Sequence, residues 1–355
     1  MVTFISTAVV ASLGGYLLSL FHVPLAWMIG AMIASSILAW FRPAALPKRT
    51  RPVALMILGA SFGLGFTKPV FLAVVSALPA IALAGLLTIL AGLAIARMFS
   101  MVARVDMKTG YFCAVPGGVT VMPVLAEKAG AYVPAVTLAQ TIRMVVVVLT
   151  FPPLMLLIND PSSRSIFHAE SLPVYLPGLV LILICGLVSA LVLQVFRIAN
   201  PWMLGPLFFS MAITALWHAP SGFPHWLINA AQIGMGASLG VKLTGKFLLG
   251  SKRLAFASVI SSFALAALLA ALALGVAYLS GLPKEAVILG MAPGGTPEMV
   301  VTAAALNVAV PLVLGFHLVR MLISNLLIGP IWHIAEMAGM AGRDIAKPDS
   351  ETGKL

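Results

Sequence analysis

Long apolar stretches follow one another along almost the whole chain, separated by short polar loops. A helix needs about 20 apolar residues to cross a lipid bilayer, and solid apolar runs favour helices over alternating strands. The pattern therefore predicts an all-α polytopic membrane protein. The predicted apolar segments are 2–21, 24–41, 52–66, 70–99, 109–126 and 133–158, followed by 173–196, 201–217, 226–241, 254–279, 286–306 and 308–334.

The two halves of this pattern are copies of each other, 177 residues apart. Between residues 116 and 144, 11 of 29 positions are identical at this offset. The matching motifs are Pro116-Gly117-Gly118 with Pro293-Gly294-Gly295, Gly59-Ala60-Ser61-Phe62-Gly63 with Gly236-Ala237-Ser238-Leu239-Gly240, and Arg143 with Arg320. The chain is therefore an internal duplication. Its expected parts are a first membrane repeat (1–158), a linker loop (159–172), a second membrane repeat (173–335) and a polar C-terminal tail (336–355).

The charged residues predict how the repeats are oriented. The chain is 61% hydrophobic and 9% charged, with a net charge of +11. Its basic residues lie in short loops, where Lys and Arg mark the cytoplasmic side of a membrane, so we expect no nucleic-acid partner. The basic loop 42–51 has an equivalent at 218–225 without Lys or Arg, and the basic loop of the second half is 242–253 instead. Opposite signatures predict oppositely oriented repeats, with both termini cytoplasmic.

Opposite orientation requires an odd number of crossings in each repeat. The segments to exclude as spans are 110–130 and 287–307, which Pro-Gly-Gly interrupts. Irregular backbone is tolerated at membrane depth only inside protein or beside a cavity. The expected fold is therefore an inverted repeat of five transmembrane helices plus one re-entrant Pro-Gly-Gly hairpin per half. The alternative is twelve spans in parallel repeats.

Each hairpin tip is a candidate binding site for an anionic group. Glycine permits a sharp chain reversal, and the helix after the break presents free N–H groups and the positive end of its dipole. A tight buried turn without a ligand is the alternative. The candidate substrate-binding residues at the tips are Pro116, Gly117, Gly118, Thr120, Pro293, Gly294, Gly295, Thr296 and Glu298.

Arg143 and Arg320 place one cation in the middle of an apolar segment of each repeat. An Arg at that depth costs roughly 2.5–3.5 kcal/mol to insert. We therefore expect both to face the protein interior and to be paired, with Glu298 and Glu127 as candidate partners. Each arginine either binds an anionic substrate or donates to the carbonyls of its hairpin, and the two roles are compatible.

Gln140 and His317 occupy the same repeat position, one helical turn before each arginine. Side chains three residues apart share a helix face, so both belong to the candidate site. Because imidazole titrates near neutral pH, His317 is also a candidate proton carrier. A satisfied core histidine is the alternative.

Several functions have little support in the sequence. No Gly-x4-Gly-Lys-Ser/Thr motif is present, so ATP is not the expected driver. Cys113 and Cys185 form no disulfide or metal framework. We expect no catalytic residue, metal site or cofactor, because a metal centre needs clustered ligands. The scattered histidines are His22, His168, His218, His225, His317 and His333.

The doubled motifs resemble those of one known family. Trp27-Met28-Ile29-Gly30 and Trp202-Met203-Leu204-Gly205, with the Gly-Ala-Ser-x-Gly and Pro-Gly-Gly pairs, are similar to the integral-membrane AbrB-type family. The resemblance covers residues 13–334 and implies an internally duplicated membrane protein. Members are often labelled an ammonia monooxygenase or a regulator of gene expression. At fold level the arrangement is similar to carboxylate carriers with Gly-Gly re-entrant loops between inverted five-helix repeats.

These observations predict an ion-coupled secondary transporter of a small anionic metabolite in the bacterial cytoplasmic (inner) membrane. Inverted repeats, broken segments and charges at mid-membrane depth are typical of that class. The expected partners are the lipid bilayer and a small-molecule or ion substrate, and a homodimer is compatible with the sequence. The alternative function is an indirect regulatory role in gene expression, because the chain carries no soluble DNA-binding module. Monooxygenase activity is not expected.

Overall fold

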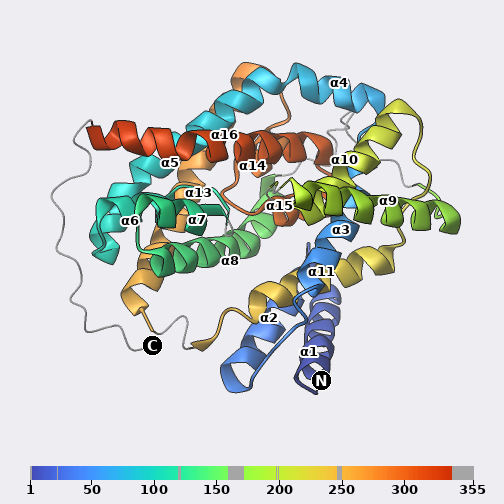
Figure 1. Cartoon of the computed structure of the whole chain (residues 1–355), viewed down its shortest axis with the longest axis horizontal. Helices are drawn as coiled ribbons and strands as arrows, with labels where there is room; N and C mark the ends of the chain where they lie inside the picture. The colour runs from blue at the N-terminus through green and yellow to red at the C-terminus, as the bar shows by residue number, and fades with distance from the viewer. Residues whose placement is uncertain are drawn as a thin grey trace. The chain divides into compact units, whose positions relative to one another are not determined.

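The computed structural model describes residues 2–21, 23–118, 121–158, 172–196, 198, 200–245 and 250–337. Of the described residues, 81% are helical and none forms a strand (Figure 1). The prediction of an all-α protein is therefore confirmed. The linker 159–171 and the tail beyond residue 337 lie outside the described residues.

The helices follow the predicted apolar segments closely. In the first half they are α1 (Val2–Ser19), α2 (Ala26–Phe41), α3 (Thr50–Gly63), α4 (Lys68–Ser76), α5 (Leu78–Ala103), α6 (Met107–Ala114), α7 (Val121–Ala129) and α8 (Val133–Ile158). In the second half they are α9 (Leu176–Val195), α10 (Pro201–Leu216), α11 (His225–Gly240), α13 (Lys252–Ser280), α14 (Lys284–Met291), α15 (Thr296–Ala305) and α16 (Val310–Met337).

Five of the described helices are long and apolar enough to cross a membrane by themselves. They are α5, α8, α9, α13 and α16, and a sixth candidate is the pair α3 and α4, which is bent by 94°. Helices α1, α2 and α10 are apolar but shorter. The sequence predicted ten membrane spans, and the lengths and compositions of the described helices support five of these. These features define an apolar helical protein of membrane-spanning dimensions.

The predicted long helix at 70–99 is divided in the structure. Helix α4 ends at Ser76 and α5 begins at Leu78, with Pro79 in its first turn. Proline lacks an N–H group and has a φ suited to the first helical turn, so it favours a helix start at this position. Apolar periodicity alone did not reveal this division, because the residues on both sides are equally hydrophobic.

The helices form two compact units, and each unit combines segments from both sequence halves. Unit 1 comprises Met1–Leu78, Val148–Leu248 and Thr296–Gly315. Unit 2 comprises Pro79–Val147, Leu249–Gly295 and Phe316–Leu355. The boundaries of the two compact units therefore differ from the boundary between the two sequence repeats.

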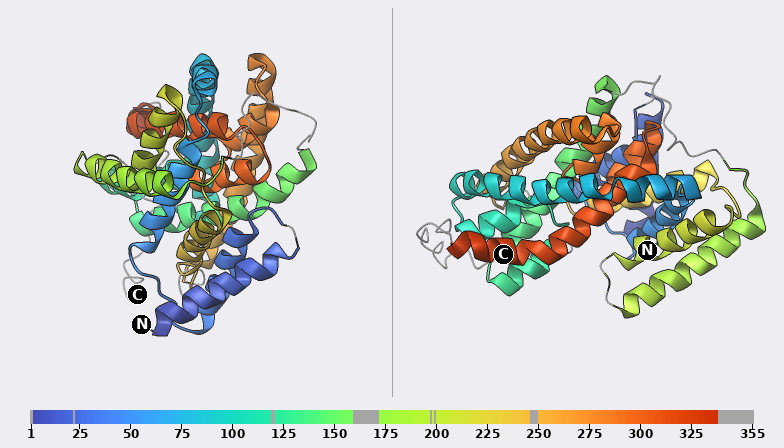
Figure 2. Two further views of the ribbon diagram at one scale, coloured as in Figure 1. Left: turned by 90° about the vertical axis from the view of Figure 1, so that its right-hand side faces the viewer. Right: turned by 90° about the horizontal axis from the view of Figure 1, so that it is seen from above.

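Unit 1 is assembled by reciprocal packing of the two repeats. Helix α2 packs against α11, while its counterpart α10 packs against α3. Helices α1 and α2 lie side by side, and so do α9 and α10 (Figures 1 and 2). Each repeat therefore supplies the partner of the other repeat's third helix.

The Gly-Ala-Ser-x-Gly motifs make this packing close. A Cβ at Gly59 of α3 would collide with the carbonyl oxygen of Met203, and a Cβ at Gly236 of α11 would collide with that of Met28. Met28 and Met203 belong to the two Trp-Met-x-Gly motifs. The doubled motifs thus contact each other across the repeats, as small residues at helix interfaces do.

The two basic loops also meet inside unit 1. The indole Nε1–H of Trp40 donates to the carbonyl oxygen of Leu243 at 2.8 Å. Arg51 and Lys242 are close enough for their like charges to interact. The chain segments before Arg51 and around Lys242 therefore lie on the same side of unit 1.

Candidate functional site

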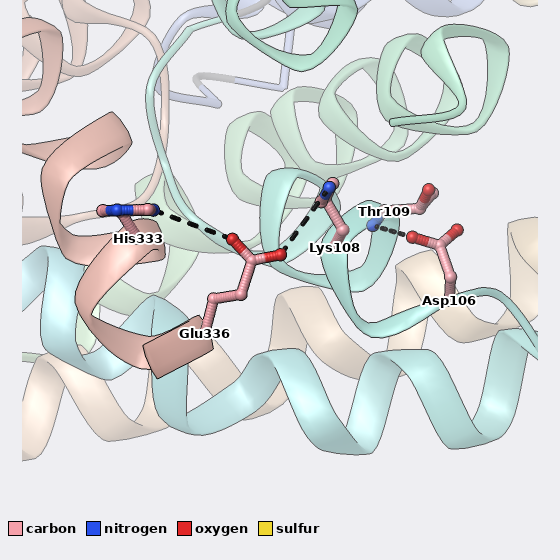
Figure 3. A network of polar contacts seen from close by, with 5 residues as sticks. All are labelled: Asp106, Lys108, Thr109, His333 and Glu336. Carbon is pink, nitrogen blue, oxygen red and sulfur yellow. Dashed lines mark hydrogen bonds and ion pairs between the residues drawn. The ribbon is translucent and has the colours of Figure 1, made fainter. Parts of the chain in front are cut away.

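Unit 2 contains most of the candidate site residues, and polar contacts hold the start of α6 within it. The carboxylate of Asp106 caps the start of α6 by accepting from the Thr109 N–H at 2.9 Å. Lys108 and His333 both approach Glu336 of α16, at 3.9 and 3.8 Å (Figure 3). These groups are partly exposed, so the ion pairs contribute little stability. The ion pair between Lys108 and Glu336 shows that the start of α6 lies beside the end of α16.

The buried contacts of Tyr111 hold α6 on α16 more firmly. Its hydroxyl donates to the carbonyl oxygen of Ile328 at 2.9 Å, and its ring packs 5.2 Å from that of Trp332. Tyr111 is fully buried, so the loss of this hydrogen bond would leave a buried polar group unpaired. The contact fixes the helix that leads into the first Pro-Gly-Gly break. The sequence reasoning did not identify Tyr111 as a positioning residue.

The first break lies between α6 and α7, and α8 closes it with two polar side chains. The Gln140 amide donates to the carbonyl oxygens of Phe112 and Val115 at 3.0 and 3.1 Å. Arg143 Nη1 donates to the carbonyl oxygen of Ala114 at 3.2 Å, and its Nη2 donates to Gln140 Oε1. Carbonyls at a helix end have no intrahelical partner, and these side chains supply one.

The second break, between α14 and α15, repeats this arrangement. His317 Nε2 bonds the carbonyl oxygen of Leu289 at 3.0 Å. Arg320 donates from Nη1 to Ala292 at 2.5 Å and from Nη2 to Gly294 at 2.9 Å. Leu289 corresponds to Phe112 in the repeat. The two breaks are therefore closed by equivalent residues, although the two arginines bond carbonyls at different repeat positions.

One bond links the two breaks directly within unit 2. Arg143 Nε donates to the carbonyl oxygen of Pro293 at 3.1 Å. Arg143 lies on α8 of the first repeat, and Pro293 begins the second Pro-Gly-Gly. The guanidinium groups of Arg143 and Arg320 are also close enough to repel each other. The fold thus brings the duplicated motifs together, 177 residues apart in the chain.

The hydrogen bonds determine the tautomer of His317. Its Nε2 faces a carbonyl oxygen, which can only accept, and its Nδ1 lies 2.8 Å from Arg320 Nη2, which can only donate. Nε2 must therefore carry the proton and Nδ1 must be an acceptor. This neutral imidazole has the same donor and acceptor arrangement as the Gln140 amide. A second proton on Nδ1 would face a guanidinium, so the geometry opposes the proton-carrier role for His317.

The hydrogen bonds of the arginines bear out one of the two roles expected for them, donation to the carbonyls of the breaks. Arg143 is 4% exposed and Arg320 8% exposed, which confirms that both face the interior. Their partners in the described part of unit 2 are carbonyl oxygens, an amide and an imidazole, rather than the carboxylates of Glu298 or Glu127. The expected pairing with a carboxylate is therefore not found in the described part of unit 2, whereas the alternative, donation to hairpin carbonyls, is.

The glycines of the two tips differ in their backbone conformation. Gly118 has a φ of +91°, whereas Gly117, Gly294 and Gly295 are not among the described residues with positive φ. At Gly117 a Cβ would collide with the Met122 side chain, which would have to shift. A glycine with positive φ therefore makes the chain reversal at the first tip but not at the second. Pro116 and Pro293 are both buried at the start of their breaks.

The remaining candidate residues lie elsewhere. Thr120 is outside the described residues. Thr296 and Glu298 begin α15 and belong to unit 1, although they follow Gly295 directly in the chain. Among the described residues, no group of three His, Cys, Asp or Glu side chains could hold a metal ion.

The fold and the site together define an apolar, all-helical membrane-type protein in which a buried arginine closes each of two broken helices. The chain belongs to the AbrB family, because the family described as "Transition state regulatory protein AbrB" matches residues 2–336. This confirms the resemblance seen in the doubled motifs.

Two relatives match most of the chain. YhjN of Bacillus subtilis (strain 168), an uncharacterized protein, is 27% identical over 92% of this chain and 91% of its own length. A protein of Escherichia coli (strain K12), named provisionally as regulator AbrB, is 24% identical over 87% of this chain and 89% of its own.

Proposed function

We propose that this protein is an ion-coupled secondary transporter of a small anionic metabolite, with its binding site at the two Pro-Gly-Gly breaks. The observation that carries the proposal is the pair of buried guanidinium groups at equivalent repeat positions, with no carboxylate among their described partners. Two uncompensated buried cations are costly, and an anionic ligand would offset that cost.

The site has donors to offer an anion. A guanidinium has five N–H donors, and three hydrogen bonds from each arginine leave two per side chain among the described residues. A planar guanidinium suits a carboxylate held at two points. The free N–H groups at the start of α7, in the same unit, would add to this positive environment. In this proposal the arginines both hold the breaks and attract the substrate.

The proposed topology is the inverted repeat, with each break re-entering from one side and both termini in the cytoplasm of a bacterium. Reciprocal packing of α2 with α11 and of α10 with α3 supports it, since two repeats related by a twofold axis would exchange partners in this way. The adjacency of Trp40 and Leu243 also supports it, because the basic loops then share the cytoplasmic side.

Transport would be tested in vesicles of bacterial lipid containing the purified protein. Uptake of labelled mono-, di- and tricarboxylates would be compared with and without a proton gradient. We expect at least one carboxylate to accumulate, and Arg253→Gln, at an exposed arginine, to behave as the wild type. Accumulation no greater than in protein-free vesicles for every carboxylate would contradict the proposal.

A second candidate function is an indirect regulatory role in gene expression, favoured by the description of the family and by the name of the Escherichia coli relative. A transported metabolite whose level controls transcription would join the two functions. Deletion of the gene, followed by return of a transport-inactive variant, separates them: a regulatory role independent of transport would be restored by that variant. In neither function does the protein act as an enzyme.

A further inference from the structure

Glu298 is the one acidic side chain of α15, and it is completely buried. Its exposed fraction is 0%, and neither carboxylate oxygen has a hydrogen-bond partner among the described residues. The other buried glutamate of the described chain, Glu285, lies 3.9 Å from the Lys284 ammonium. Buried polar groups are nearly always hydrogen-bonded, so Glu298 is an exception that requires a reason.

The charged surroundings of Glu298 do not supply a partner. Within unit 1, α15 packs against α3, whose titratable side chain is Arg51. Arg51 interacts electrostatically with Glu298, but the two groups do not approach within the 4.0 Å of an ion pair. No other residue of α15 titrates. The carboxyl group therefore has one distant cation and, beyond the backbone N–H of Glu298 itself, no donor among the described residues.

A neutral carboxyl group fits this position better than an ionised one. Transfer of a carboxylate from water into an apolar interior without donors is far more costly than transfer of the protonated acid. The first turn of α15 favours negative charge through the helix dipole, but this effect is much smaller than the desolvation of an ion. The surroundings of Glu298 in this conformation therefore favour its protonated form.

The repeat shows that this carboxyl group is an addition to the shared framework. The residue equivalent to Glu298 in the first repeat is Val121, so closure of a break does not require a carboxylate. Glu298 also lies three residues after Gly295, where the chain passes from unit 2 into unit 1. His317, the other candidate for a proton, is held neutral by Leu289 and Arg320.

We propose that Glu298 is the proton-carrying group of this protein, and that one proton accompanies the anion in the transport cycle. The inference rests on the proposed transport function. A proton from water on one side forms the O–H bond of the carboxyl group, and the same bond breaks when the proton passes to water on the other side. No oxidant or covalent intermediate is involved. The proton also offsets one negative charge of the anion that it accompanies.

Protonation can be measured without knowledge of the substrate. Infrared difference spectra of the protein in lipid at neutral pH should contain a carboxylic-acid C=O band that Glu298→Gln removes. Glu285→Gln changes a buried glutamate that has a lysine beside it, and it should leave this band in place. Glu298→Asp keeps a carboxyl group at this position and should retain the band at a shifted frequency. This control distinguishes loss of the carboxyl group from misfolding of the variant. Identical spectra for the wild type and Glu298→Gln would overturn the inference.

Coupling is tested in vesicles that contain a pH-sensitive dye, with succinate and citrate as probes. Entry of the anion should acidify the wild-type lumen. Glu298→Gln should lower that acidification at least tenfold while it preserves exchange of labelled for unlabelled anion. Undiminished acidification by Glu298→Gln would overturn the inference and leave transport intact. If neither probe moves with the wild type, transport of these carboxylates is contradicted, and the infrared band alone decides whether Glu298 holds a proton.

Discussion

Arg143 donates from Nε to the carbonyl oxygen of Pro293 at 3.1 Å, so a side chain of the first repeat completes the break of the second. Arg320 has its partners within its own repeat, at Ala292 and Gly294. The two equivalent arginines therefore differ in their contacts. Arg143 donates to carbonyls of both breaks, and Arg320 donates to carbonyls of one break.

Replacement of these arginines by lysine should destabilise the protein. Lysine retains the charge but not the planar fork of donors, and a hydrogen bond to a charged group contributes about 1.5–3 kcal/mol. We expect Arg143→Lys to lower the thermal unfolding midpoint in detergent more than Arg320→Lys, because its bond to Pro293 joins the two breaks, whereas the bonds of Arg320 lie within one repeat. Arg253→Lys, at an exposed arginine with one bond to Val102, is the control and should change little. Equal midpoints for all three variants would contradict the capping role.

His317→Gln should have little effect on stability or on transport. Glutamine supplies one donor and one acceptor, as the neutral imidazole does, and Gln140 already fills the equivalent position. We expect the unfolding midpoint to stay within the range of surface variants and the pH dependence of transport to be unchanged. His317→Ala should destabilise by roughly 1–3 kcal/mol, because it leaves the Leu289 carbonyl unpaired. A loss of pH dependence in His317→Gln would restore the histidine as proton carrier.

The two tips should differ in their tolerance of alanine. Gly118 has a positive φ, which costs an L-residue about 1–2 kcal/mol. Gly118→Ala should therefore destabilise by that amount, although the space around its Cβ is open. Gly295→Ala has no such backbone penalty. Chemical or thermal unfolding of the two variants checks the difference, and a larger loss at Gly295 would count against this account.

Glycine-to-alanine changes in two helices should have opposite signs. Gly236→Ala places a methyl group against the Met28 carbonyl and should destabilise the contact between α11 and α2. Gly275 in α13 has no neighbouring atom within 4 Å of the place that a Cβ would take, so Gly275→Ala should stabilise by about 0.5–1 kcal/mol through lower backbone entropy in the unfolded chain. The same unfolding assay measures both. Stabilisation by Gly236→Ala would show that the helices do not pack as described.

The basic loops should both be accessible from the cytoplasm. Single cysteines at Thr50 and Ser251 should react with a membrane-impermeant maleimide in inside-out vesicles and not in intact cells. Both positions flank basic clusters that the positive-inside rule places on that side. Labelling of the two cysteines from opposite sides would contradict the inverted repeat and favour twelve parallel spans.

The sequence alone determined the helical class, the duplication, the positions of both breaks and the interior location of Arg143 and Arg320. These features depend on the lengths of the apolar segments, on the positions of Pro and Gly, and on the cost of exposing a charge to lipid. All of these can be read from the residue types. It also indicated that Gln140 and His317 share a helix face with the arginines, since that follows from helical spacing alone.

Only the tertiary structure decided what these side chains contact. The sequence offered hairpin carbonyls as one alternative for the arginines, but not which carbonyls accept: these belong to Ala114, Ala292, Pro293 and Gly294. Every residue type has a carbonyl, so the bond from Arg143 to Pro293 of the other repeat could not be predicted. The neutral tautomer of His317 depends on two such contacts. The lack of a hydrogen-bond partner for Glu298 likewise depends on which groups pack around it, and the sequence does not show which groups these are.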